Sequence, residues 1–360
     1  MNKSILNPEI HFIKAFFVFF MISNHLCIWS IEYFEQMGLP ETQNQIYQIF
    51  TRIPQLQYLI LFSLAIPISA GIIYRDRLSR FVAGDRLLYL PMGSIFKDAL
   101  FLHLLECFVR SVAFGLDSFF DWSELKFISL SMILIALLGR IRLFLIPLLG
   151  FLILAISPWI HHELNSFSDH YFIKILIGNN GHGFFWPLFP WFFSLAFGFT
   201  FHHFYLTIPR SFFNCTILTL SLLLSLIWMQ LPSLDLIEYH NVTGGKMYWP
   251  GLGFFVIYID AFLLTFLLGS LLTRFIHFQN QGLIHCLSKG ILLTYIFIYT
   301  LGHELNSFFL SHSTLSPLAS LIILLMAFLF ISLLIGRLAL KKLGKTSYKI
   351  TLRRATRKPI

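Results

Sequence analysis

Long apolar runs recur from one end of this chain to the other, most of them close to the length that crosses a lipid bilayer. A transmembrane helix needs about 20 predominantly apolar residues, and hydrophobic residues make up 57% of the 360 positions here. Backbone groups in lipid must be hydrogen-bonded internally, and runs of this length achieve that as helices and not as barrel strands. The sequence therefore predicts an all-α fold, a single polytopic bundle of about ten transmembrane helices.

The loops between these runs are too short for a soluble domain. We predict one transmembrane domain over residues 1–340 and a basic tail over residues 341–360. No small-residue cleavage site precedes the first run, which is therefore expected to stay as a helix. Runs four and five could instead form a re-entrant pair, which is the main alternative in the count. The predicted spans are 10–31, 57–74, 95–116, 126–138, 142–160, 184–206, 212–232, 251–274, 283–302 and 315–338.

Lysine and arginine are distributed unevenly between the loops, and this sets the predicted orientation. Cytoplasmic loops carry an excess of both residues. The loops after the even-numbered spans and the C-terminal tail hold most of them, and the loops after the odd-numbered spans hold few. Both termini are therefore expected in the cytoplasm. The formal net charge of +9 is mostly this topology signal. It does not indicate nucleic-acid binding, because aromatic and basic residues do not interleave on a soluble module.

The opposite face is rich in carboxylates, histidines and aromatic rings. Such side chains suit hydrogen bonding and stacking against a polar, uncharged ligand such as a sugar. Ordinary anchoring at the membrane interface is the alternative explanation for any one of them. The string HELNSF occurs twice on this face, at residues 162–167 and 303–308. It lacks the second histidine of the HExxH zinc motif, and we expect no metal.

Two ionisable side chains, Lys14 and His25, lie inside the first apolar run. Ionisable groups within a membrane span are costly and therefore indicate a function. A rise of 1.5 Å per residue places His25 about 16 Å beyond Lys14, toward the outer leaflet. The pKa of a histidine can be set near neutrality, so His25 is a candidate general base or transient acyl carrier. Lys14 either acts at the cytoplasmic side or extends to the inner headgroups.

Further charged residues fall inside other predicted spans. Glu106 and Arg110 are four residues apart on one helical face, which predicts a structural ion pair that lines a cavity. Asp260 lies in the middle of its span without an obvious partner in the same helix. A carboxylate in lipid without a partner must be protonated, paired with another group or in contact with water. Asp260 is therefore a better candidate for a functional residue than the Glu106–Arg110 pair.

Residues 179–198 form the most specific string in the chain, NNGHGFFWPLFPWFFSLAFG. Its polar start ends an outer loop, and two prolines, Pro187 and Pro190, then fix the backbone as it enters the membrane with Trp186 and Trp191. Judged by its residues alone, the string is a structural entry motif.

This string and landmarks in the first two spans resemble the heparan-α-glucosaminide N-acetyltransferase-like family of membrane proteins, which is related to the acyltransferase-3 family. That family has an Asp-x-x-Arg-Gly motif and a histidine in its first helix, a small-residue and glycine pair before a basic loop, and a PLFPW signature. Here a lysine stands in place of the arginine and a histidine in place of the aspartate. The matching positions are His11, Lys14, Ala15, His25, Ser69, Ala70, Gly71, Arg75, Pro187–Trp191 and Gly198.

The resemblance implies a membrane acyltransferase that moves an acyl group, with acetyl expected, from cytoplasmic acyl-CoA to a sugar or glycan on the outer face. His25 would be the base or acyl carrier, with Asn24 or Asp260 as an orienting group. Basic residues on the cytoplasmic side would bind the donor's phosphates, a task that suits arginine. The expected donor-binding residues are Lys14, Arg75, Arg77, Arg80, Arg140 and Arg142. The expected acceptor-binding residues are His182, Trp186, Trp191 and Glu304.

The expected partners are the lipid bilayer, acyl-CoA and the acceptor glycan; a homodimer stays open. A bacterial inner membrane is the expected location. The competing class is a transporter or flippase for a small polar or glycolipid substrate, in which the charged residues of the spans form a path. Against it, the sequence shows no convincing inverted repeat of interrupted helices. A catalytically silent membrane scaffold is the third alternative.

Overall fold

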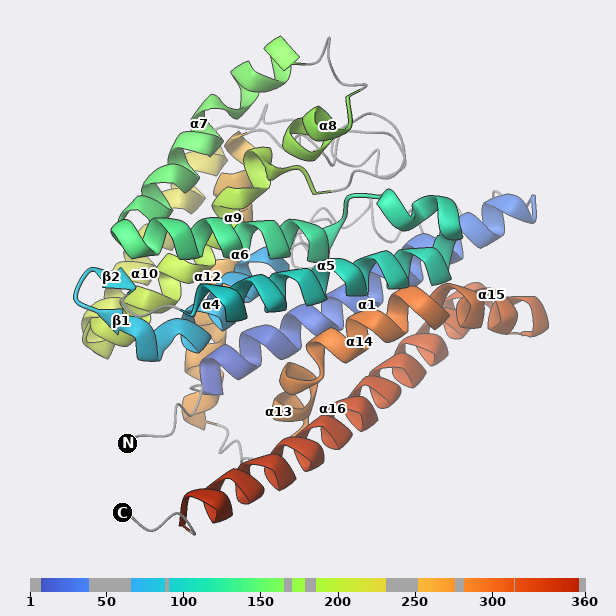
Figure 1. The fold of residues 1–360 in the computed structure, drawn as a ribbon. Coiled ribbons are helices and arrows are strands. Elements are labelled where there is room, and N and C mark those ends of the chain that lie inside the picture. Colours follow the sequence, from blue (N-terminus) through green and yellow to red (C-terminus); the bar gives the residue numbers. More distant parts are fainter. Residues whose placement is uncertain are drawn as a thin grey trace. The chain divides into compact units, whose positions relative to one another are not determined.

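The computed structural model describes residues 8–38, 66–87, 91–164, 170–178, 186–230, 252–275, 282–313 and 315–355. Nearly all of these residues are helical (Figure 1), so the predicted all-α fold is confirmed for the described part of the chain. The sheet within this part is a short antiparallel hairpin of β1 (Val82–Ala83) and β2 (Arg86–Leu87).

Each predicted span overlaps helical structure in its described residues, although several spans begin or end outside a helix, and residues 57–65, 184–185, 231–232 and 251 lie outside the described ranges. Spans four and five form two separate helices of 18 and 20 residues. The ninth span is divided into several pieces. The long helices are α1 (Pro8–Gln36), α4 (Ile66–Leu78), α5 (Met92–Phe114), α6 (Glu124–Ile141), α7 (Leu145–Leu164), α9 (Leu188–Thr207), α10 (Arg210–Gln230), α12 (Leu252–Phe275) and α16 (Pro317–Ala355).

Four described helices are long and apolar enough to cross a membrane by length and composition alone. They contain Pro8–Cys27, Arg210–Ile227, Phe254–Thr273 and Ala319–Lys341. The larger number of about ten spans stays a prediction, as does the cytoplasmic location of the termini. Helix α16 continues to Ala355, so the first part of the predicted basic tail extends the last helix.

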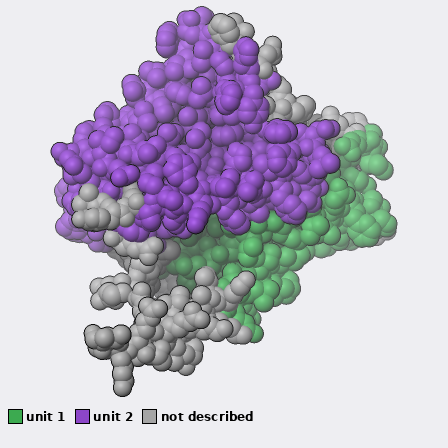
Figure 2. Space-filling model, viewed as in Figure 1, with its two compact units in different colours: residues 1–63, 268–360 green, residues 64–267 purple. Residues whose placement is uncertain are grey.

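The chain divides into two compact units, residues 64–267 and residues 1–63 with 268–360 (Figure 2). In the first of these, α4 and α9 cross at two glycines. A Cβ on Gly198 would collide with the carbonyl oxygen of Ile68, and a Cβ on Gly71 would collide with that of Leu195. Small residues allow membrane helices to approach this closely. Two landmarks far apart in the sequence therefore form one helix crossing.

In the other unit, α1 packs against α16 and against the divided ninth span. That span consists of α13 (Leu283–Lys289), α14 (Ile291–Phe297), a π-helical segment (Ile298–Gly302) and α15 (His303–His312). Gly302 leaves room for the indole of Trp29, because a Cβ there would lie 2.8 Å from that ring. This packing aligns the π-helical segment with the middle of α1.

Candidate active site

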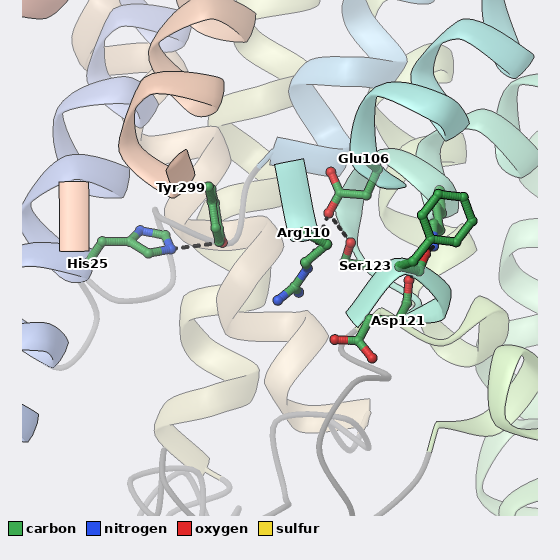
Figure 3. Close-up of polar contacts among 8 residues, drawn as sticks. His25, Glu106, Arg110, Asp121, Ser123 and Tyr299 are labelled. Carbon is green, nitrogen blue, oxygen red and sulfur yellow. Dashed lines mark hydrogen bonds and ion pairs between the residues drawn. The ribbon is translucent and has the colours of Figure 1, made fainter. Parts of the chain in front are cut away.

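His25 lies on α1 with both ring nitrogens in hydrogen bonds, and Figure 3 shows the one with Tyr299. Nδ1 is 2.8 Å from the carbonyl oxygen of Met21, and Nε2 is 2.8 Å from the hydroxyl of Tyr299. A carbonyl oxygen can only accept, so Nδ1 carries the proton and donates it. In the neutral ring Nε2 is then the acceptor, and Tyr299 donates to it. The basic nitrogen of His25 therefore faces a phenol.

Tyr299 belongs to the π-helical segment, and sequence reasoning missed it as a site residue. Its ring lies 4.6 Å from that of Tyr295 and 4.9 Å from that of His25, measured between centroids. π-Helical turns are rare and are frequent at functional sites. The π-helical backbone therefore indicates a functional site next to His25, independently of the presence of a histidine in an apolar run.

A row of rings continues from His25 along α1 to α15. The centroid of Trp29 lies 5.4 Å from that of His25 and 5.8 Å from that of His303. Glu304 follows His303, and its side chain is 81% exposed. The structure thus places one predicted acceptor residue, Glu304, next to a row of rings that begins at the predicted base. The neighbouring Asn24 is half-buried on α1.

Lys14 is buried near the start of α1. Nearby, His11 Nδ1 lies 2.7 Å from the hydroxyl of Ser288, and its ring is 4.3 Å from that of His285. Lys14 is close enough to His285 to act on it electrostatically. Two of the family landmarks therefore lie in a polar, basic environment formed with α13.

Asp260 on α12 is partnered from a neighbouring helix. It accepts hydrogen bonds from the hydroxyls of Ser221 and Ser225, both on α10, the latter at 2.6 Å. The sequence showed no partner within α12, and the partners come from α10. Asp260 belongs to the 64–267 unit and His25 to the other, so an orienting role toward His25 stays a prediction.

The predicted donor-binding arginines differ in their environment. Arg75 is buried, whereas Arg77 and Arg142 are about half exposed and bound to Asp98 and Asp85. Arg140 is exposed, and the side chain of Arg80 lies outside the described part of the structure. Arg75 therefore has the most distinctive position.

Arg75 donates from Nε and Nη2 to Nδ1 of His203, at 3.3 and 2.9 Å. Its Nη1 is buried and has no hydrogen-bond partner among the described residues. The same holds for both ring nitrogens of the buried His202, although its Nε2 lies 3.9 Å from a carboxylate oxygen of Asp76. Buried polar atoms without partners are unusual and call for an explanation such as a bound ligand or water. The buried N–H groups of Arg75 Nη1 and the one N–H of a neutral His202 suit a phosphate group.

Trp186 and Trp191 are core residues and not an open stacking platform. Their centroids are 4.4 Å apart, and both side chains are at most 2% exposed. Rings of α12, including Phe255 and Tyr258, surround Trp191. The indole nitrogen of Trp122 donates to the carbonyl of Trp186 at 2.7 Å. The expected contact of these two rings with an acceptor gains no support, and His182 lies outside the described residues.

The predicted pair of Glu106 and Arg110 is confirmed. Arg110 Nε lies 3.4 Å from Oε1 of Glu106, and Ser123 donates its hydroxyl to the same oxygen (Figure 3). Glu106 is fully buried, and Arg110 also lies over the ring of Phe114. These bonds hold α5 against the start of α6. Within the described ranges, no three His, Cys, Asp or Glu side chains gather as metal ligands.

A family model described as heparan-alpha-glucosaminide N-acetyltransferase, catalytic, matches residues 7–236. The match includes His25 and Arg75, whereas Asp260, Tyr299 and Glu304 lie beyond it. Comparison with curated proteins and with solved structures gives no match.

Proposed function

The chain belongs to the heparan-alpha-glucosaminide N-acetyltransferase catalytic family, and from that premise we propose that it is a membrane acyltransferase whose acceptor is a sugar or glycan. Acyl-CoA is the proposed donor, with acetyl-CoA as the first choice. The family supports the reaction class. His25 is proposed as the reacting group because of its position. It is a half-buried imidazole whose basic nitrogen accepts a hydrogen bond from a phenol.

His25 acts in this proposal as the general base. Nε2 takes the proton that the acceptor's hydroxyl or amine releases as it attacks the thioester carbonyl, and the coenzyme A thiolate leaves. The carbonyl of Met21 fixes the tautomer and stabilises the positive charge that forms on the ring. As an acyl carrier, Nε2 would have to attack the thioester itself and so break its hydrogen bond with Tyr299, whereas a base can receive a proton through that hydrogen bond. The base role is therefore better supported than the carrier role.

Arg75 and the nearby His202 are proposed to contact the phosphates of coenzyme A. A guanidinium binds phosphate oxygens through several N–H groups, and Nη1 of Arg75 is available for this. The exposed basic residues Arg77, Arg140 and Arg142 would add long-range attraction. Lys14 is buried like Arg75, but its ammonium lacks the planar fork of N–H groups that binds phosphate bidentately, so it is the weaker candidate for direct phosphate contact.

For the acceptor we assign Glu304, whose exposed carboxylate can accept hydrogen bonds from sugar hydroxyls. Trp186 and Trp191 would not stack on the sugar themselves, since aromatic neighbours cover both rings.

The proposed topology has about ten spans and cytoplasmic termini, in a bacterial inner membrane. The loop distribution of lysine and arginine supports the orientation. With this orientation the donor binds from the cytoplasm and the acceptor lies on the other face. A transporter would use the buried charges as a path, but Glu106 and Asp260 are already bound to serine hydroxyls of neighbouring helices or loops.

Acetyl transfer by the full-length protein in nanodiscs tests the function. Radiolabelled acetyl-CoA and a panel of glycan acceptors are supplied to the wild type and to His25→Ala. General-base catalysis contributes about 10²–10⁴-fold, so the variant should lose at least about 100-fold in rate. The matched control is His312→Ala, which removes an exposed histidine from the end of α15 and should retain full activity.

Equal rates for the wild type and His25→Ala would remove His25 from the mechanism. Absence of transfer with every acyl donor, by protein that still binds its substrate, would favour transport.

A further inference from the structure

We propose that Tyr299 is a second catalytic residue, a proton relay between the acceptor and His25. The proposal rests on the acyltransferase function above and deepens it. It assigns a chemical role to a residue that lies beyond the family match and that the sequence did not single out.

The hydrogen bonds of His25 leave the imidazole no direct route to an acceptor. Nδ1 is committed to the carbonyl of Met21, and the lone pair of Nε2 points at the hydroxyl of Tyr299. Any proton that reaches Nε2 without rearrangement of the site must therefore come from the phenol. The phenol oxygen has two lone pairs and can accept the acceptor's proton as it donates its own.

The π-helical segment explains why Tyr299 is in this position. Each residue of an α-helix turns the next by about 100°, so one extra residue in a turn re-aims every side chain that follows. The wider turn costs regular hydrogen bonding, which is partly recovered where the Thr300 hydroxyl donates to the carbonyl of Ile296 at 2.7 Å. Gly302 and Trp29 seat the end of the segment against α1. The distortion thereby brings the phenol within hydrogen-bond distance of the imidazole.

The ring of Tyr295 holds the phenol in place, and the phenol and the imidazole are only partly buried. Tyr295 packs against Tyr299 at 4.6 Å between centroids. Tyr299 and His25 are both only partly buried, unlike Tyr295, which is 4% exposed. Partial exposure of both side chains is what a pair that exchanges protons with a bound acceptor requires.

The proposed step balances as follows. The acceptor's oxygen or nitrogen bonds to the acyl carbon, and its proton passes to Oη of Tyr299. The original phenol proton passes to Nε2 of His25, which becomes positively charged. The carbon–sulfur bond breaks, and the thiolate of coenzyme A takes up one proton as the relay resets. Acceptor and acyl-CoA give acylated acceptor and coenzyme A, with no net charge left on the protein.

Two substitutions separate a relay from a purely positioning role. Tyr299→Phe removes the hydroxyl and should lower kcat at least about 100-fold, as loss of an acid–base group does, while the KM for acetyl-CoA changes little. Incorporation of 4-aminophenylalanine at residue 299 restores a hydrogen-bond donor to Nε2 but not a group that readily gives up its proton. This second variant should stay inactive if Tyr299 is a relay, and should recover activity if it only positions His25.

The matched control is Tyr295→Phe, which keeps the stacked ring and removes a hydroxyl one turn away; its rate should stay near that of the wild type. A proton inventory in mixtures of light and heavy water gives an independent readout. If two protons move in the transition state, a plot of the wild-type rate against the deuterium fraction of the solvent is curved. If only one proton moves, the plot is a straight line.

The outcomes distinguish this proposal from the function on which it rests. Transfer by the wild type that is lost in His25→Ala but kept in Tyr299→Phe, or a linear proton inventory, would overturn the relay and leave the acyltransferase standing. Absence of transfer by the wild type would overturn both. If Tyr299→Phe is poorly folded, recovery of activity by 4-aminophenylalanine still overturns the relay, and a folded but inactive 4-aminophenylalanine variant supports it.

Discussion

Two arginines of this apolar chain, Arg75 and Arg110, have buried guanidinium groups in different environments. Arg110 is paired with the fully buried Glu106, whereas Arg75 donates to a neutral imidazole nitrogen of His203 and retains a buried N–H without a described partner. A buried charge is costly unless it is paired and hydrogen-bonded. Arg110 is therefore expected to matter for stability, and Arg75 for ligand binding.

Replacement of Arg75 by methionine should weaken coenzyme A binding by about 10- to 100-fold, because a hydrogen bond to a charged group contributes about 1.5–3 kcal/mol. Calorimetric titration of the nanodisc-embedded protein with coenzyme A measures this directly. Lys97→Met removes an exposed charge from the same predicted cytoplasmic side and controls for general electrostatics. Unchanged affinity in Arg75→Met would exclude Arg75 as a phosphate ligand.

The pair on α5 supports a prediction about stability. Arg110→Met leaves the Glu106 carboxylate buried without its cation, and loss of one partner of a buried pair costs about 3–5 kcal/mol. The double variant Glu106→Gln with Arg110→Met removes both charges and keeps a group for Ser123 to bond, so it should be more stable than Arg110→Met alone. Denaturant titration gives the unfolding free energies. A double variant that is the less stable of the two would refute the pairing account.

The helices of this chain were largely predictable, and their irregularities were not. Apolar runs indicated where helices lie, and the four-residue spacing of Glu106 and Arg110 indicated their pairing, because both signals are local. A π-helical turn leaves no hydrophobic pattern, so the position of Tyr299 could not be read from the sequence. The serine partners of Asp260 lie on another helix, and a single sequence does not tell which helices touch.

The crossing of α4 and α9 makes a prediction at the scale of these elements. Gly198→Ala places a Cβ against the carbonyl of Ile68, and overpacking of this kind costs about 1–3 kcal/mol because backbone and not a flexible side chain must move. Gly93→Ala on α5 meets nothing within 4 Å and serves as the control. Thermal unfolding should show a lower midpoint for Gly198→Ala and no loss for Gly93→Ala. Equal midpoints would mean that the two helices are not in backbone contact.

Across the whole molecule, the family match and the candidate catalytic residues do not coincide. The match ends at residue 236, and Tyr299 and Glu304 lie in the part of the chain that follows. The proposed reaction therefore depends on both parts, since His25 comes from the matched region and its hydrogen-bond partner from beyond it. Fold class and reaction class follow from the apolar pattern and the family, whereas the roles of individual residues are proposals that rest on their hydrogen bonds and burial.

Transfer across sealed membranes tests the central claim most directly. Inside-out vesicles that carry the protein are given radiolabelled acetyl-CoA outside, at the cytoplasmic face, with a glycan acceptor enclosed. We predict that the wild type labels the enclosed glycan and that His25→Ala, at the same amount of folded protein, does so at least about 100-fold more slowly. Equal labelling of the enclosed glycan by the two proteins would contradict this account.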